Sequence, residues 1–172
     1  MEQYGTYERL ITPIEDRMMR SVWAVTQQPE DAEEALQNAL AVIWCKLSRI
    51  ERHPNPQALV LRICINAAYD VVRANARRRA REAHAEAKQS ADAESPAESL
   101  SRREQRSVVM RAIKQLSRNQ AAAVILRLIH GESYEEIGRV LGCKDATVRK
   151  HVERGRERLR RLLAPLIDEG TL

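Results

Sequence analysis

The feature that most constrains the fold is the stretch SYEEIGRVLGCKDATVRKHVERGRERL, residues 133–159. Ser133 lies three residues before Glu136, which is the spacing of a capping box, so a helix is expected to begin there. Gly142 can adopt the left-handed backbone conformation that ends a helix abruptly. Asp145 is then expected to cap a second helix. The stretch therefore predicts two helices joined by a tight turn.

The spacing within this stretch is typical of a helix-turn-helix. Gly138 lies four residues before the turn glycine, where the two helices cross and little side chain fits, and Val148 lies six after it, pointing back into the junction. Such a motif places its second helix in the DNA major groove. The simpler alternative is an αα-corner with a charged surface helix. The residues expected to face DNA are Lys144, Asp145, Thr147, Arg149, Lys150, Arg154 and Arg156.

Helical periodicity dominates the rest of the chain, alternating strand patterns are absent, and Gly and Pro number only six each. The apolar stripe disappears over residues 81–101, whose Ala, Glu and Ser composition indicates a flexible linker. We therefore expect an all-α protein with two small helical domains. The predicted division is an N-terminal domain of three to four helices (1–80), a linker (81–102), a C-terminal four-helix domain with the helix-turn-helix (103–165) and a tail (166–172).

The charge distribution supports contact with a polyanion. The chain has a net charge of +5, but residues 61–81 contain six basic residues and one acidic, and residues 139–161 contain nine basic and three acidic. An acidic segment separates the two basic blocks. Two such blocks suggest two contact sites for nucleic acid. The alternative for either block alone is a solvated helix face.

Other functional classes find little support in the sequence. Cys45, Cys64 and Cys143 form no ligand cluster, so neither zinc nor a disulfide framework is indicated, and all three are expected to be small core residues in a reducing cytosol. The four histidines are isolated, and we expect no catalytic set, metal or cofactor and hence no enzyme. No signal peptide is indicated, and no segment approaches the ~20 apolar residues of a membrane span. A cytoplasmic protein is expected.

With these residues in view, a family resemblance emerges at both ends of the chain. Residues 116–159 resemble the promoter-recognition domain (region 4) of bacterial extracytoplasmic-function (ECF) sigma factors. Residues 29–44 (PEDAEEALQNALAVIW) and 61–79 (LRICINAAYDVVRANARRR) resemble two helices of region 2 in the same family. The C-terminal matches are Gly131, Ser133, Tyr134, Glu136, Ile137, Leu141, Gly142, Thr147, Val148, Arg154, Arg156 and Leu159. The N-terminal matches are Asp31, Ala32, Glu33, Gln37, Trp44, Arg62, Ile63, Asn66, Asp70 and Arg73.

The resemblance implies a transcription initiation factor that binds core RNA polymerase through the β′ clamp helices and the β flap. It also implies recognition of promoter DNA, and regulation by an anti-sigma factor is the family's common route. The residues implied in polymerase binding are Asp31, Glu33, Glu34, Gln37 and Asn38. Those implied in reading and opening the -10 element are Arg62, Asn66, Asp70, Arg73, Arg77 and Arg78. Region 4 would recognise the -35 element.

Departures from the family pattern limit what the resemblance implies. The loop Arg49–Asn55 would hold a base flipped from the non-template strand, but aromatic stacking platforms are few. Tyr69 and Trp44 are the candidates, and Trp44 is expected in the core. The triplet RKH replaces the usual KSR in the second helix, so the preferred -35 sequence does not transfer. The alternative function is an autonomous helix-turn-helix regulator such as a repressor dimer, although no dimerisation heptad is evident.

Overall fold

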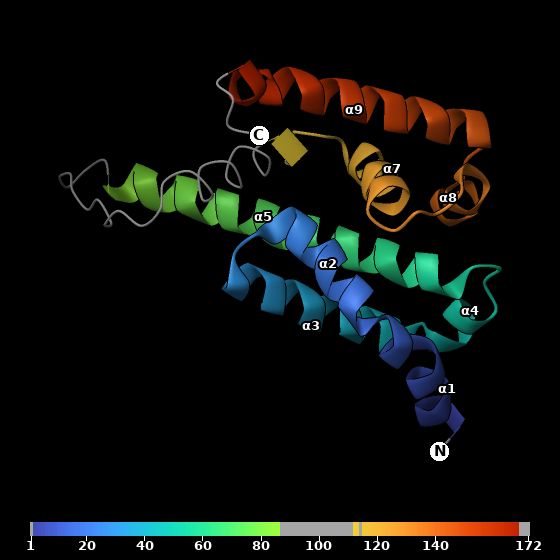
Figure 1. Ribbon diagram of the computed structural model, residues 1–172. Coiled ribbons are helices and arrows are strands. Elements are labelled where there is room, and N and C mark those ends of the chain that lie inside the picture. Colours follow the sequence, from blue (N-terminus) through green and yellow to red (C-terminus); the bar gives the residue numbers. More distant parts are fainter. Residues whose placement is uncertain (1, 87–111, 114, 169–172) are drawn as a thin grey trace.

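The computed structural model describes residues 2–86, 112–113 and 115–168, and within them it contains helices and no strand (Figure 1). The predicted all-α class is therefore confirmed. The elements are α1 (Glu2–Ile11), the short 3-10 helix η1 (Thr12–Ile14), α2 (Glu15–Thr26), α3 (Pro29–Cys45), α4 (Leu47–Glu51), α5 (Pro56–Glu86), α7 (Arg118–Leu128), α8 (Tyr134–Leu141) and α9 (Asp145–Asp168).

Helix boundaries in the N-terminal half follow proline. Pro13 lies in η1, which separates α1 from α2. Pro29 is the first residue of α3, where its missing N–H costs nothing. α3 and α4 are separate helices, because Lys46 between them leaves helical geometry (φ −112°, ψ 12°).

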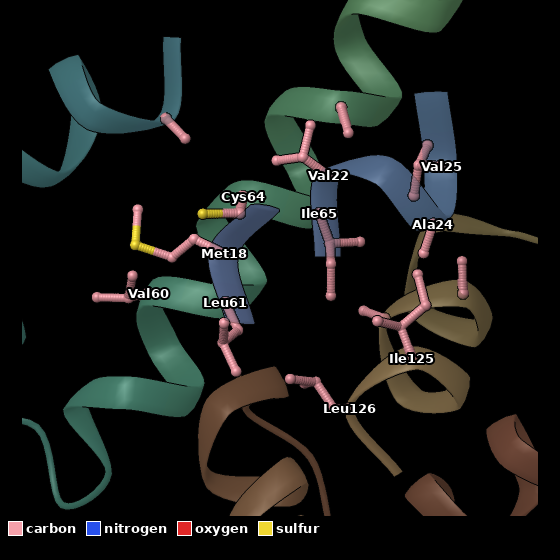
Figure 2. Close-up of a cluster of buried hydrophobic side chains, with 14 of the residues drawn as sticks. Met18, Val22, Ala24, Val25, Val60, Leu61, Cys64, Ile65, Ile125 and Leu126 are labelled. Carbon is pink, nitrogen blue, oxygen red and sulfur yellow. The ribbon is translucent and has the colours of Figure 1, made fainter. Parts of the chain in front are cut away.

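The N-terminal half is built around α5, with α2 and α3 packed against it. Met18 and Val22 of α2 lie against Leu61 and Ile65 of α5, and all four are almost completely buried (Figure 2). Aliphatic side chains thus form this core, as a chain without Phe requires. α5 continues to Glu86, six residues beyond the predicted end of the first domain.

The C-terminal half consists of α7, α8 and α9. Ser117 caps α7 in a capping box with Gln120. Where α7 and α9 cross, a Cβ on Gly155 would lie only 2.6 Å from Cγ2 of Val124, so glycine is required for the close approach. This crossing was not anticipated from the sequence.

The two halves share one continuous hydrophobic core. Ile125 and Leu126 of α7 are buried beside Ala24 of α2 and Ile65 of α5 (Figure 2). In Figure 1 the C-terminal helices lie above α2 and α5, with α8 above the α4 end of the molecule. The predicted linker from residue 87 on, and most of residues 103–116 at the start of the predicted C-terminal domain, fall outside the described residues. The division into domains therefore stays a prediction.

Candidate nucleic-acid interface

The helix-turn-helix forms as its local sequence predicts. The Glu136 N–H donates to Ser133 Oγ (3.1 Å) and the Ser133 N–H donates to Glu136 Oε2 (2.9 Å), closing the capping box. These hydrogen bonds lower the pKa of the Glu136 carboxyl. Gly142 ends α8 at φ 68°, and a Cβ on Gly138 would lie 2.7 Å from the Cys143 carbonyl oxygen. The turn and the helix crossing thus both depend on glycine.

The second helix of the motif, α9, presents a polar and largely basic face. Val148 and Val152 are buried and fix its orientation against the rest of the half. All seven residues predicted to face DNA are exposed at this end of the chain. Asp145 is the first residue of α9 rather than its cap, and its carboxylate accepts from Arg149 Nη2 at 3.2 Å. The expected capping role of Asp145 is therefore replaced by an ion pair within the helix.

Tyr134 contributes to this surface in a way that sequence reasoning missed. The guanidinium carbon of Arg149 lies 4.4 Å from the centre of the Tyr134 ring, and that of Arg127 lies 4.8 Å from it. Arg127 also donates to the Glu132 carbonyl oxygen at 3.0 Å. Cation–π contacts of this kind hold an arginine side chain in place. Tyr134 therefore positions Arg149 near the start of α9.

A second polar face runs along α5. At about 100° per residue, Arg62, Asn66, Asp70, Arg73 and Arg77 lie within an arc of roughly 80°. Arg73 and Arg77 are exposed. Arg78 is also exposed but points roughly 160° away from Arg62 around the helix. The predicted -10 residues thus share one face, with Arg78 outside it.

The C-terminal half covers one end of that α5 face. Arg62 donates to the carbonyl oxygen of Val140, and burial lowers the Arg62 pKa. Asp70 forms an ion pair with Arg118. Two of the residues expected to contact the -10 element are therefore engaged by the other half of the molecule.

The loop before α5 also contacts the C-terminal half. Asn55 caps α5 by accepting the Ala58 N–H at 2.9 Å. Its Nδ2 atom lies 3.2 Å from carboxylate oxygens of both Glu132 and Glu136. Nearby, Arg17 donates to Glu132 at 2.7 Å. The loop predicted to capture a base thus faces the turn between α7 and α8.

The two aromatic candidates exchange their expected places. Tyr69 is only 5% exposed and its hydroxyl donates to the Ile113 carbonyl at 2.7 Å, so it is not available to stack on a base. Burial raises its pKa. Trp44, expected in the core, is 43% exposed and packs edge-to-face on Tyr7 with ring centres 5.7 Å apart. Trp44 is therefore the better platform of the two.

The acidic residues of α3 form an exposed stripe. Glu33, Glu34, Gln37 and Asn38 are exposed, whereas Asp31 is half-buried and accepts from Asn75 of α5 at 2.7 Å. A groove of about 510 Å³ lies between α3 and α5. Residues predicted for two different roles meet there, namely Glu34 and Asn38 (polymerase) with Asn66 and Asp70 (DNA).

The described residues also bear on metal binding, cysteine burial and membrane insertion. Over the described residues, no group of three or more His, Cys, Asp or Glu side chains is placed to hold a metal ion. Only Cys64 is buried, which raises its pKa to about 12; Cys45 is exposed and Cys143 partly so, correcting the expectation that all three are core residues. Among the described helices, none combines the length and apolar character needed to cross a membrane.

Comparison with known proteins places this geometry in a family. The profile of "Sigma-70, region 4" matches residues 99–159. The chain is 32% identical over 162 residues to the ECF RNA polymerase sigma factor SigE of Mycolicibacterium smegmatis, covering 92% of this chain and 62% of that protein. It is 29% identical over 168 residues to the RNA polymerase sigma-E factor of Streptomyces coelicolor, covering 96% and 91%.

A local match and a solved structure agree with these relatives. The RNA polymerase sigma-H factor of Pseudomonas aeruginosa is 38% identical over 79 residues, so this chain spans 41% of the sigma-H factor and 62% of SigE. The sigma factor RpoE of Bartonella quintana, solved in complex with the anti-sigma factor NepR, matches with a TM-score of 0.58 and 26% identity over 95% of this chain and 98% of RpoE.

The region 4 profile, these relatives and the RpoE structure together support a protein of the sigma-70 family. Within that family, the chain is similar over nearly its whole length to sigma factors of the extracytoplasmic-function (ECF) group.

Proposed function

We propose that this chain is an ECF-type RNA polymerase sigma factor that binds core polymerase and directs promoter recognition, DNA melting and transcription initiation. One observation carries the proposal: a single chain presents an exposed basic recognition helix in its C-terminal half and an acidic helix beside a basic helix face in its N-terminal half. A repressor needs the first surface only. A sigma factor needs both, and it needs no catalytic residues of its own.

We assign -35 recognition to the exposed face of α9. Arg149 is the best placed for base contact, because Tyr134 and Asp145 hold its guanidinium near the start of the helix. Arginine pairs bidentately with guanine edges in the major groove. Lys150 and Arg154 are exposed and suit phosphate contacts, which add affinity without sequence preference.

We assign core-polymerase binding to the stripe of α3 that contains Glu33, Glu34 and Gln37. Exposed carboxylates on one helix face favour a basic partner surface, as the β′ clamp helices would offer. The basic end of α5, with Arg73 and Arg77, would contact the -10 element and its phosphates. The α3–α5 groove would then lie between the surface that binds polymerase and the surface that contacts DNA.

The proposal also covers the cellular location of the protein and a regulatory partner. A role with core polymerase implies a cytoplasmic protein. An anti-sigma partner is proposed because the similar RpoE was solved with NepR.

The acidic segment 82–98 is proposed to lie along the polymerase cleft toward the RNA path. Deleting residues 82–98 would then impair initiation while leaving DNA binding by region 4 intact, and unchanged initiation would reject this role.

The test is promoter-dependent transcription by core polymerase with and without the protein, on promoters of the source genome including its own. We expect transcripts only when the protein is present. The double variant Lys150→Ala, Arg154→Ala should reduce them strongly, while Arg158→Ala with Arg161→Ala removes two exposed charges further along α9 and should have little effect. A protein that binds its DNA site tightly without polymerase, and stimulates no promoter, would instead be an autonomous regulator.

A further inference from the structure

A pocket lies where the two halves of the molecule meet. It has a volume of about 460 Å³, within the range of small-molecule sites. α4, the loop after it and α5 form one wall, and α8 with the turn glycine forms the other. Figure 1 shows α4 and α8 at the same end of the molecule. The pocket therefore exists only while the halves are packed together.

The charges that line this pocket have one sign. Lys46, Arg49, Arg62 and Arg139 contribute four cations, and among the described residues that line the pocket none is acidic. The α3–α5 groove, by contrast, contains Glu34 and Asp70 beside its single lysine. Several like charges in one concave site concentrate the positive potential and attract anions.

Arg62 is half-buried, whereas the other three cations of the pocket are exposed. Its guanidinium is half-buried and donates to the Val140 carbonyl oxygen, which is a neutral acceptor. A charge withdrawn from water is costly unless an opposite charge lies nearby. Arg139 differs, because it forms an ion pair with Glu135, one turn earlier on α8. An anion in the pocket would supply the charge that Arg62 lacks.

The pocket also has an apolar wall. Leu59 and Ile63 are only partly buried and face it, and Ile50 and Val140 complete the apolar lining. Inorganic phosphate would leave this apolar wall in contact with water. A ligand that combines phosphates with a flat, largely apolar ring system would satisfy both the cations and the wall.

We propose that this pocket binds a free nucleotide, with its phosphates on the cations and its base against Leu59 and Ile63, and that the ligand holds the two halves together. A strand of promoter DNA also carries phosphates and bases, so it is the alternative ligand for this pocket. It is disfavoured because the packing that forms the pocket also engages Arg62 and Asp70, which contact with the -10 element would require. The proposal does not depend on the proposed sigma function.

Calorimetric titration of the full chain tests the proposal at about 0.15 M salt, where weak surface attraction is screened. The probes are GTP, ATP, inorganic phosphate and a short single-stranded DNA. We expect saturable binding of at least one nucleotide, with inorganic phosphate much weaker. Binding of the oligonucleotide alone, or of no probe, would overturn the proposal.

Variants from each wall decide whether the site is shared by both halves. Arg139→Ala on α8 and Lys46→Ala before α4 should each weaken nucleotide binding about tenfold, the value of one charged hydrogen bond. Both side chains are exposed, so the fold should survive. Arg158→Ala removes a charge remote from the pocket and should change affinity less than about twofold. Equal losses in all three variants, or a loss from Lys46→Ala alone, would reject a pocket built by both halves.

Discussion

The two charged faces of the molecule use the same residue types but differ in availability. On α9, every residue predicted to face DNA is exposed, and the internal partners of Arg149 hold it in place without covering it. On α5, the C-terminal half engages Arg62 and Asp70 and leaves Arg73 and Arg77 open. A basic helix in a sequence therefore says nothing about whether its charges are accessible in the folded chain.

Several contacts between the two halves are polar, and they involve α2 as well as α5. Besides Arg62 and Asp70, Ser21 and His130 meet at 2.7 Å, and Arg17 pairs with Glu132 at 2.7 Å. Polar interfaces within a chain separate more readily than apolar ones. Beneath them, however, the apolar core is continuous between the halves. Four predictions test this comparison, two at the boundary between the halves and two at the exposed surface of the C-terminal half.

The largest effect is expected from Leu126→Ala. Leu126 is fully buried in the core shared by the halves, so its truncation should lower the free energy of unfolding by about 2–5 kcal/mol. Leu128→Ala on the same helix is the control, because Leu128 is 55% exposed and should change stability by less than about 0.5 kcal/mol. Urea denaturation measures both. Equal effects would mean that α7 does not pack on the N-terminal half.

Gly138→Ala should disrupt the C-terminal surface alone. The added Cβ would meet the Cys143 carbonyl at 2.7 Å, and overpacking of this kind costs about 1–3 kcal/mol. We expect a loss of stability together with loss of -35 DNA binding, measured by denaturation and fluorescence anisotropy. Gly5→Ala in α1 has open space around it and should be neutral or slightly stabilising. Wild-type DNA binding by Gly138→Ala would disprove the tight crossing.

Acid should loosen the boundary between the halves through His130. Burial, followed by the charges of Arg17 and Arg20, lowers its pKa from 6.5 to about 4. The unfolded chain thus binds a proton that the folded chain refuses, so stability falls as pH drops from about 6.5 toward 4. Allowing for its half exposure, we expect a loss on the order of 1 kcal/mol by about pH 5.

The matched variant for this prediction is His130→Gln, which removes the titrating ring. Unfolding midpoints measured from about pH 8 to pH 5 should fall less steeply in the variant than in the wild type. Carboxylate titration affects both proteins alike, so the difference between the two slopes isolates His130. Parallel slopes would show that the ring is freely protonated in the folded state.

The smallest effect is expected from Tyr134→Leu, which keeps apolar bulk but removes the ring that holds Arg149. Cation–π contacts at exposed sites contribute about 0.5–1 kcal/mol, which corresponds to a two- to fivefold loss of -35 affinity. Tyr134→Phe retains the ring face and should bind as the wild type does. Fluorescence anisotropy with duplex DNA measures both variants, and a Phe variant as weak as the Leu variant would assign the effect to the hydroxyl.

The sequence predicted best what short-range chemistry determines. The capping box at Ser133, the left-handed turn at Gly142 and the buried Val148 depend on residues within about two helical turns, and all three are confirmed. The long-range contacts were out of reach. Arg62 and Val140 are 78 positions apart, and no periodicity within one helix shows which partner covers its face.

The prediction of which aromatic side chain is buried was wrong for the same reason. Tyr69 and Trp44 both lie at helical positions with apolar neighbours, so the pattern alone did not separate a buried ring from an exposed one. The difference comes from elements distant in sequence: the Tyr69 hydroxyl donates to the Ile113 carbonyl, whereas Trp44 packs edge-to-face with Tyr7 and stays 43% exposed. The roles assigned to the polymerase-binding and DNA-binding residues stay predictions, since exposure permits contact without demonstrating it.

The unbroken length of α5 sets a physical scale for what its polar face can reach. From Arg62 to Arg77 the helix rises about 22 Å, at 1.5 Å per residue. Stacked bases advance by about 3.4 Å along a strand. A rigid helix of this length therefore runs beside roughly six base pairs, with Arg62 near one end of the segment and Arg77 near the other. The number of promoter positions that α5 can contact is limited by the length of the helix, however many charges the helix presents.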